Sequence, residues 1–144
     1  MKKTVQLLIV FMLSMRIDAV NQNLIVSDTF PQKLSEFHFF VDGSAQIPHS
    51  DVIPYELIST LFSDYSYKQR WVYVPKNTKA QYQENWVFDF PIGSALIKTF
   101  YYPIDERNPE LGKNLIETRL LLRKESGWEA VSYAWNDEQN EAFK

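Results

Sequence analysis

The stretch Trp86–Tyr102 reads WVFDFPIGSALIKTFYY, and it decides the fold that we expect for this chain. In its first five residues, large aromatic side chains alternate with Val and Asp, which is the period of two typical of a β-strand. Pro91, which has no N–H group to donate, and Gly93, which tolerates positive φ angles, then predict a sharp corner. After the corner, both faces of Ala95–Tyr102 are largely apolar. This second segment is therefore expected to be a central strand covered on both sides.

A β-hairpin is predicted towards the C-terminus. Residues Leu115–Arg123 alternate between a mostly apolar face and a charged face, the first formed by Ile116, Thr118, Leu120 and Leu122 and the second by Glu117, Arg119 and Arg123. This pattern is typical of a strand with one solvated side. The turn residues Glu125–Gly127 follow, so Trp128–Trp135 is expected to return as the antiparallel partner.

Short helices are expected in the first half of the chain. Thr29–Phe40 predicts one, because Pro31 suits a first helical turn and Leu34 and Phe37 follow at helical spacing. Residues 53–70 also place apolar side chains at helical spacing, which predicts a single helical turn.

The β pattern begins at Trp71–Val74, which alternates and is followed by turn residues at Pro75–Thr78. Strands and turns then dominate the rest of the chain. The predicted fold class is mainly β, an antiparallel sheet or sandwich with one or two short N-terminal helices.

Residues 1–19 have the pattern of a secretory signal peptide. Two lysines precede the apolar run Val5–Met15, and Ile17 and Ala19 offer a cleavage site. The alternatives are an uncleaved N-terminal anchor and a buried strand. With cleavage, residues 20–144 are expected to form a single β-rich domain that is periplasmic or secreted and has no stable membrane span.

The composition excludes several classes of function. The 144 residues include no cysteine, so the chain has no disulfide, thiolate nucleophile, Cys-bound zinc or covalently attached haem of its own. Loss of residues 1–19 would change the formal charge from −3 to −5, leaving 12 basic and 17 acidic residues. Nucleic acids bind clustered Lys and Arg, so an acidic domain with interleaved charges argues against a nucleic-acid partner.

No metal site is expected. His38 and His49 are the only histidines, and their separation matches no recognised pattern of metal ligands. The segment Asp105–Glu110 carries oxygen ligands that would suit calcium, but it lacks the EF-hand pattern. An ordinary solvated loop is the preferred interpretation.

Lys98 is a candidate cofactor-binding residue, because a lysine between Leu96 and Phe100 on a strand face would have a lowered pKa if it were buried. The alternative is a cross-strand ion pair with Glu117 or another acid, with the ammonium group reaching the solvent at the rim of the sheet. A cleft or a stabilising network of charges is a second candidate feature, formed by Asp64, Lys68, Arg70, Glu117 and Arg119. No catalytic residue is assigned, since spacing nominates no pair of carboxylates.

An aromatic platform for a sugar ring or a haem face is the third candidate, formed by Tyr101, Tyr102, Trp128, Tyr133 and Trp135. Aromatic pairs also fill small β-cores, which is the competing interpretation. Tyr133 and Trp135 share one strand face opposite two alanines, so that face is a candidate for exposure, and both residues join Lys98 as candidate cofactor-binding residues.

The chain resembles a family of secreted bacterial proteins of unknown function, in which such a domain precedes a c-type haem site. The likeness spans residues 30–142 and rests on Lys33–Phe37, Ile53–Leu57, Leu61–Tyr65 with Lys68 and Arg70, Phe88–Gly93, Leu96–Phe100, Leu115–Leu121, and Tyr133–Asn136 with Glu138 and Gln139. Longer members of that family carry a CxxCH motif downstream of the position that matches Asn136. The present chain departs from the family there, because it ends at Lys144 without a cysteine.

The resemblance implies a non-catalytic scaffold that packs against a haem-bearing C-terminal segment or redox partner, with haem c present only in a longer form. Residues 20–144 would then be either the N-terminal part of a longer haem protein or a relative that has lost the haem part. A carbohydrate-binding module that uses an aromatic sheet face is the alternative. A small hydrolytic enzyme is a third hypothesis, and it would need converging acids such as Asp64 and Glu117.

Overall fold

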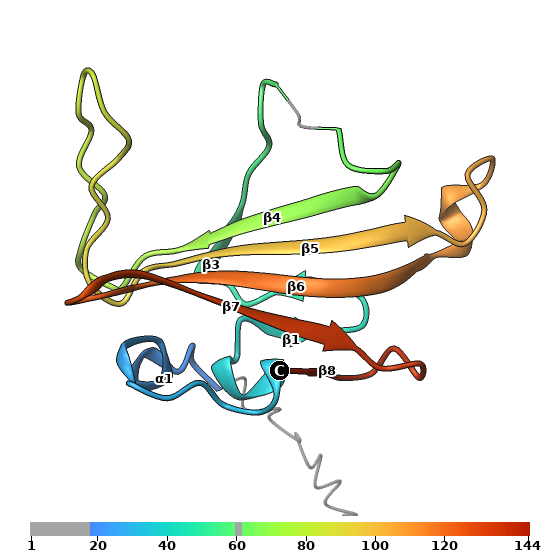
Figure 1. Cartoon of the computed structure of the whole chain (residues 1–144), viewed down its shortest axis with the longest axis horizontal. Helices are drawn as coiled ribbons and strands as arrows, with labels where there is room; N and C mark the ends of the chain where they lie inside the picture. Colours follow the sequence, from blue (N-terminus) through green and yellow to red (C-terminus); the bar gives the residue numbers. More distant parts are fainter. Residues whose placement is uncertain (1–17, 60–61) are drawn as a thin grey trace, which may run out of the picture.

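The computed structural model describes residues 18–59 and 62–144, and within them the chain is mainly β (Figure 1). Six strands form one antiparallel sheet in the order β3-β4-β5-β6-β7-β8, and β1 and β2 form a separate hairpin. The strands are β1 (Phe40–Asp42), β2 (Ile47–Pro48), β3 (Val52–Pro54), β4 (Tyr67–Tyr73), β5 (Ala95–Pro103), β6 (Lys113–Lys124), β7 (Gly127–Trp135) and β8 (Ala142–Phe143). The helical elements are α1 (Gln22–Val26) and the 3-10 helices η1 (Leu34–Phe37) and η2 (Pro109–Leu111). The predicted fold class is confirmed.

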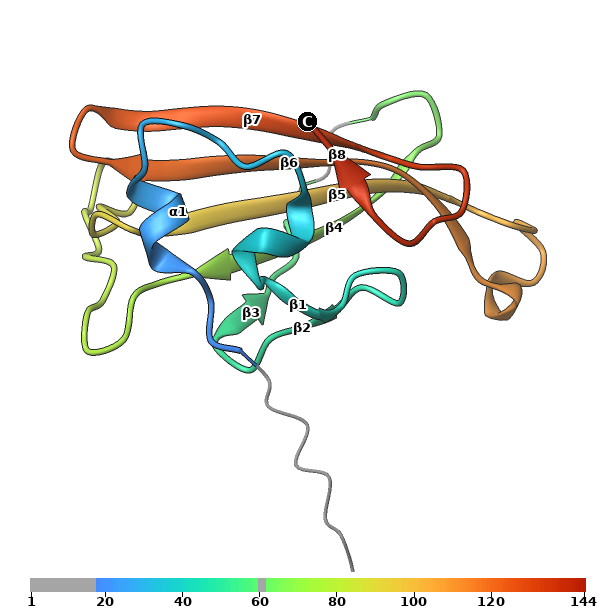
Figure 2. The same cartoon turned by 90° about the horizontal axis from the view of Figure 1, so that it is seen from below.

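One face of the six-stranded sheet carries the core. Figure 2 shows α1, η1 and the β1–β2 hairpin lying across this face. The buried side chains between the two layers come from both, and include Ile25, Leu34, Phe37, Phe39, Trp71, Tyr73, Ala95, Ile97, Leu120, Leu122 and Tyr133. Phe37 stacks on Phe39 with ring centroids 5.1 Å apart and meets the Tyr133 ring edge-on at 6.0 Å. The N-terminal segment is thus the second layer of the domain.

None of the helices in the described residues covers the opposite face of the sheet, which we call the open face. Two loops rise from this side, one between β3 and β4 and one between β4 and β5 (Figure 1). Side chains of β5 alternate between the two faces, so Ala95 and Ile97 are buried while Leu96 and Lys98 are only half-buried. The prediction of a central strand is confirmed by the order of the sheet, but coverage on both sides was wrong.

The predicted strand at residues 86–90 is wrong. These residues belong to the loop between β4 and β5, where Gln81 and Asp89 form a single bridge through two backbone hydrogen bonds. The Trp86 side chain is 79% exposed. The Phe88 ring contacts that of Phe90, and the Phe90 ring lies against Trp128 of β7, but these are side-chain contacts and not strand pairing. Without a partner for its backbone, an alternating segment has no ladder to join.

The predicted hairpin Leu115–Trp135 is confirmed as β6 and β7, with one exception in the assignment of faces. Thr118, Leu120 and Leu122 are buried as expected, but Ile116 is 46% exposed. The pairing with β5 shifts by one residue between Phe100 and Tyr101, which brings Leu115 into the core in place of Ile116. A β-bulge of this kind adds one residue that a strict period of two cannot anticipate.

Other expectations are corrected near the N-terminus. The helix predicted at Thr29–Phe40 is reduced to the 3-10 turn η1, and Pro31 lies outside it. The helical turn predicted within residues 53–70 is absent from the part that the structure describes, where β3 ends at Pro54 and β4 begins at Tyr67. The signal-peptide prediction falls largely on residues 1–17, which lie outside the described residues.

No helix within the described ranges is long and apolar enough to cross a membrane.

Candidate functional site

A group of cations occupies the middle of the open face. Arg70 on β4 lies opposite Lys98 on β5, and Lys98 lies opposite Arg119 on β6. Lys68 stands two residues before Arg70, opposite Phe100. These four residues, Lys68, Arg70, Lys98 and Arg119, share one face because the pairing of the antiparallel strands is in register, and we call them the cationic cluster.

Phe100 lies at the centre of the cationic cluster. The Nζ atoms of Lys98 and Lys68 are 4.9 and 5.8 Å from the centroid of its ring, and Cζ of Arg119 is 4.8 Å away. The negative face of an aromatic ring attracts cations, so Phe100 helps to hold these like charges together. A ring quadrupole carries no net charge, however, and it does not neutralise them.

Glu117 is the acidic residue that joins this face. It pairs with Arg119, and not with Lys98 as the sequence suggested. Burial lowers the pKa of the Lys98 ammonium, and the nearby charges of Arg119, Arg70 and Lys68 lower it further, while Glu117 partly opposes them. Lys98 therefore lies between Arg70 and Arg119 on the neighbouring strands, and of these two arginines Arg119 is the one paired with Glu117.

Arg70 is the most buried member of the cationic cluster, with only 7% of its surface exposed. Within residues 18–59 and 62–144, its guanidinium makes no hydrogen bond or ion pair. A buried charge is normally compensated by an opposite charge or by several hydrogen bonds, because removal from water is costly. Arg70 is therefore the member of the cationic cluster that has the least contact with water, and its remaining contact is through the cavities that it lines.

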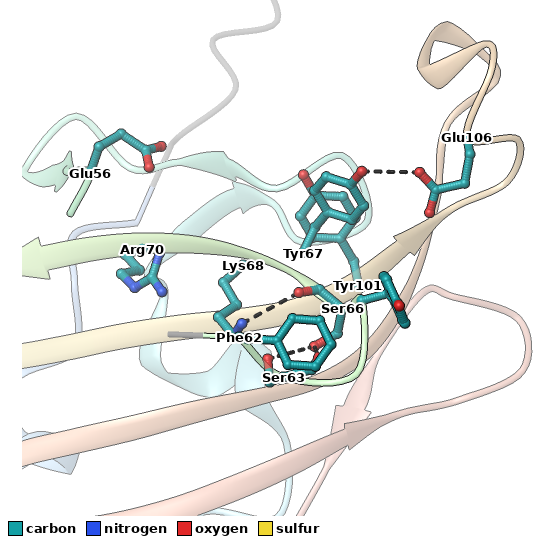
Figure 3. Close-up of a pocket in the computed structure, with 10 residues that line it drawn as sticks. Glu56, Phe62, Ser63, Ser66, Tyr67, Lys68, Arg70, Tyr101 and Glu106 are labelled. Atoms are coloured by element: carbon teal, nitrogen blue, oxygen red, sulfur yellow. Dashed lines mark hydrogen bonds between the residues drawn. The ribbon is translucent and has the colours of Figure 1, made fainter. Parts of the chain in front are cut away.

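Two adjoining cavities share Arg70. The first, of about 380 Å³, lies on the open face and is lined by Tyr55, Leu57, Arg70, Leu96, Ile97, Lys98, Arg119, Leu120, Leu121, Ala130, Val131 and Ser132. The second, of about 700 Å³, lies at the edge of β4 beneath the loop that precedes it (Figure 3). The first cavity combines an apolar floor with three cations, which is the arrangement that binds an anion attached to an apolar body.

The second cavity is lined by polar and aromatic groups that already bond to each other. The Tyr67 hydroxyl donates to Oε2 of Glu106 over 3.0 Å, and this bond raises the pKa of Tyr67 (Figure 3). The Tyr67 ring also lies 5.6 Å from that of Tyr101. Lys68 donates to the backbone oxygen of Ser66. Several polar groups of this cavity thus have partners within the protein, although Arg70 and Glu56 also line it.

The predicted charge cluster is largely brought together. Lys68, Arg70, Glu117 and Arg119 meet on the open face. Among the described residues the Asp64 carboxylate bonds to none of them. Asp64 lies in the loop before β4, where its backbone oxygen accepts a hydrogen bond from the Tyr102 hydroxyl at 3.0 Å. The alternation of Lys68 and Arg70 with Tyr67 and Gln69 was the signal for their common face, and reading this segment as helical concealed it.

The predicted aromatic platform is dispersed. Tyr133 is completely buried, its hydroxyl donates to the backbone oxygen of Pro31 at 3.0 Å, and burial raises the pKa of Tyr133 to about 12. Trp135 points to the same covered side and donates its Nε1–H to Oγ1 of Thr118 at 3.0 Å. The expectation that this face is exposed was wrong, because the N-terminal layer covers it.

The remaining platform residues lie at opposite ends of the sheet. Trp128 pairs with Arg123 at one end of β6, whereas Tyr101 and Tyr102 pair with the other end. Because the strand pairing separates Trp128 from Tyr101 and Tyr102 in this way, these residues cannot form a single platform.

The histidines and the acidic loop are engaged in local bonds. Nδ1 of His38 lies 3.1 Å from the backbone oxygen of Ala19, and Nδ1 of His49 accepts from the backbone N–H of Asp51. Asp105 accepts hydrogen bonds from the side chain and the backbone of Arg107, which hold the pKa of that carboxyl below its usual range. Within the described part of the chain, no group of three or more His, Asp or Glu residues is arranged to hold a metal ion.

No protein-family model, curated protein or solved structure matches the chain. The resemblance to a haem-associated secreted family therefore stays a prediction, and the argument for function rests on the geometry of the open face.

Proposed function

We propose that the chain is a non-catalytic scaffold domain whose open face receives a haem-bearing segment or redox partner. The observation that carries this proposal is the cationic cluster beside an apolar floor. Leu96, Leu121 and Ala130 supply the apolar surface, and Arg70 and Lys98 supply charges without a bonded carboxylate in the described residues. A haem presents a flat apolar ring and two propionates, and this surface offers complements to both.

The scaffold would contribute shielding and charge, and not ligands to iron. His38 and His49 are both engaged in local hydrogen bonds and neither lines the cavity on the open face. An apolar surface that excludes water, together with fixed cations near the propionates, tunes the potential of a haem held by another segment. Haem c would supply the electron transfer, while the present residues would bind and orient its carrier.

Hydrolysis is supported less well by the geometry. A glycoside hydrolase needs two carboxylates that flank a groove at a defined separation. The open face presents Glu117, which is paired with Arg119, and the second candidate acid, Asp64, belongs to a loop beside β4.

The test of the scaffold proposal is the intact mass of the native protein in the periplasmic fraction of its source cells, measured together with a haem stain. A product longer than 144 residues that stains for covalent haem supports the proposal. A mass that matches residues 20–144, without haem, contradicts it.

A carbohydrate-binding module is a second candidate, and one observation favours it. The loop between β4 and β5 exposes the rings of Tyr82, Trp86 and Phe88. Exposed aromatic rings stack on sugar rings, and this loop replaces Tyr133 and Trp135 as the place where such a surface exists. Binding to an insoluble polysaccharide that is lost in Trp86→Ala but kept in the buried-face variant Trp135→Phe would support this candidate. Equal binding by both variants would argue against it.

A further inference from the structure

We propose that the cavity of about 380 Å³ around Arg70 is a binding site for a small amphiphile with an oxyanion head group, a carboxylate or a phosphate, on an apolar body. This inference goes beyond the scaffold proposal, because it concerns a free ligand and does not require a haem-bearing segment.

The first step of the argument is the state of Arg70. Its side chain is 93% removed from solvent and no described residue bonds to its guanidinium, although it lines the cavity. Lys98 lies directly opposite on the next strand and adds a like charge. Like charges that face each other in a sheet repel, and a guanidinium with little exposed surface keeps only part of the compensation that water gives. An anion in the cavity removes both costs together.

The second step is the choice of head group. Arg119 shares its charge with Glu117, so Arg70 and Lys98 are the cations of this cavity that have no bonded carboxylate in the described residues. The planar guanidinium donates a pair of parallel hydrogen bonds that match a carboxylate or a phosphate. The hydroxyl-bearing residues Tyr55 and Ser132 also line the cavity, where they can complete the shell of donors.

The third step is the body of the ligand. Leu57, Leu96, Leu121 and Ala130 line the same cavity and surround the charges with apolar surface. A volume of about 380 Å³ lies in the range of small-molecule sites, which are mostly apolar with a few placed polar groups. The arrangement therefore fits a short alkyl or aryl chain.

The experiment is calorimetric titration of the full chain with octanoate, octyl phosphate and 1-octanol. The expected result is one site that binds at least one of the two anions, with the neutral alcohol at least tenfold weaker and with an affinity that falls as salt rises. The tighter of the two anions identifies the head group. Binding of 1-octanol as tight as that of both anions would overturn the proposal.

Variants locate the site. Arg70→Met removes the charge while keeping an unbranched side chain, and it should weaken anion binding at least tenfold, as should Lys98→Met. Arg107→Met removes one arginine from an exposed loop and should leave the affinity unchanged. Anion binding by Arg70→Met and Lys98→Met that equals wild type, or an equal loss in Arg107→Met, would overturn the assignment.

The melting temperatures of the variants show whether a loss of binding is caused by unfolding. Without ligand, Arg70→Met should melt at the wild-type temperature or above, since an uncompensated buried charge has been removed. With saturating anion, the wild type should gain in melting temperature and Arg70→Met should not. Failure of this experiment would leave the mass and haem test of the scaffold proposal unaffected, so that the two can fail separately.

Discussion

Arg70 and Lys98 are directly paired across β4 and β5 on the open face, and no carboxylate in the described residues is bonded to either of them. Like charges placed opposite each other weaken a sheet. Glu117, whose charge acts on Lys98, is paired with Arg119. An arrangement that costs stability in the free protein is typical of a binding surface, where a ligand or partner completes the charges.

The first prediction is that Lys98→Met stabilises the protein. The substitution removes the repulsion from Arg70 and the burial of an ammonium group, and Met occupies a similar volume beside Leu96. The free energy of unfolding in urea at pH 7 should rise by about 0.5–1 kcal/mol. Lys79→Met, in an exposed loop, should stay within about 0.5 kcal/mol of wild type. A clear loss of stability in Lys98→Met would show that its charge is compensated.

The sequence predicts the centre of the sheet well, because β5, β6 and β7 alternate over many residues and each pairs with a neighbour in the chain. The prediction from sequence fails where the alternation of apolar residues does not match the way the strands actually pair. Ile116 has the right period for the core, but the bulge beside it moves Leu115 inwards. Residues 86–90 have the right period for a strand, but none of the described strands pairs with their backbone.

The site could be predicted only in part, for a similar reason. Lys98, Glu117 and Arg119 were visible as charges on alternating strands. The burial of Tyr133 could not be predicted in this way. It depends on α1 and η1, which lie about a hundred residues earlier in the chain and cover that face. Alternation shows which residues share a face, and long-range packing decides which face is buried.

The second prediction concerns the loop that was expected to be a strand. The amides of Gln81 and Asp89 donate to each other's carbonyl groups at 2.8 and 3.0 Å, whereas the neighbouring segment has no ladder of hydrogen bonds. Hydrogen exchange followed by NMR should show protection at these two amides and nearly unprotected rates at Val87 and Phe88. The Ile97 amide, in the central strand, serves as the protected reference. Alternating protection of the amides across residues 86–90 would contradict this prediction and show that these residues form a strand.

The third prediction rests on a chain of buried hydrogen bonds between β5, β6 and β7. Oγ1 of Thr118 lies 2.7 Å from Oγ1 of Thr99 and accepts the Nε1–H of Trp135 at 3.0 Å. Thr118→Val leaves two groups without a partner and should lower the free energy of unfolding by about 2 kcal/mol, whereas Thr99→Val leaves one and should cost about 1 kcal/mol.

The double variant separates the shared bond from the rest. Because Thr99→Val and Thr118→Val remove the same hydrogen bond, their combined cost in urea unfolding should be smaller than the sum of the single costs. Strict additivity, or a larger cost for Thr99→Val than for Thr118→Val, would contradict the proposed network.

The fourth prediction is a loss of stability at high pH that depends on Tyr133. Burial, with a smaller effect of Glu36, raises its pKa to about 12 in the folded state, against about 10 in an unfolded chain. Between these values the folded state keeps a proton that the unfolded state has released, so the free energy of unfolding falls as the pH rises from about 10 to about 12. Below about pH 10 this contribution is fully present.

Tyr133→Phe tests this assignment, because it removes the titrating group but keeps the ring that packs on Phe37. At pH 7 the variant should lose about 1 kcal/mol, since the hydrogen bond to the backbone oxygen of Pro31 is gone. Between pH 10 and 12 its stability should fall less steeply than that of wild type, so the two curves converge. Burial also raises the pKa of Tyr73 and Tyr101, so some slope remains. Tyr82→Phe, at an exposed position, should follow the wild-type curve, and parallel curves for Tyr133→Phe and wild type would place the alkaline transition elsewhere.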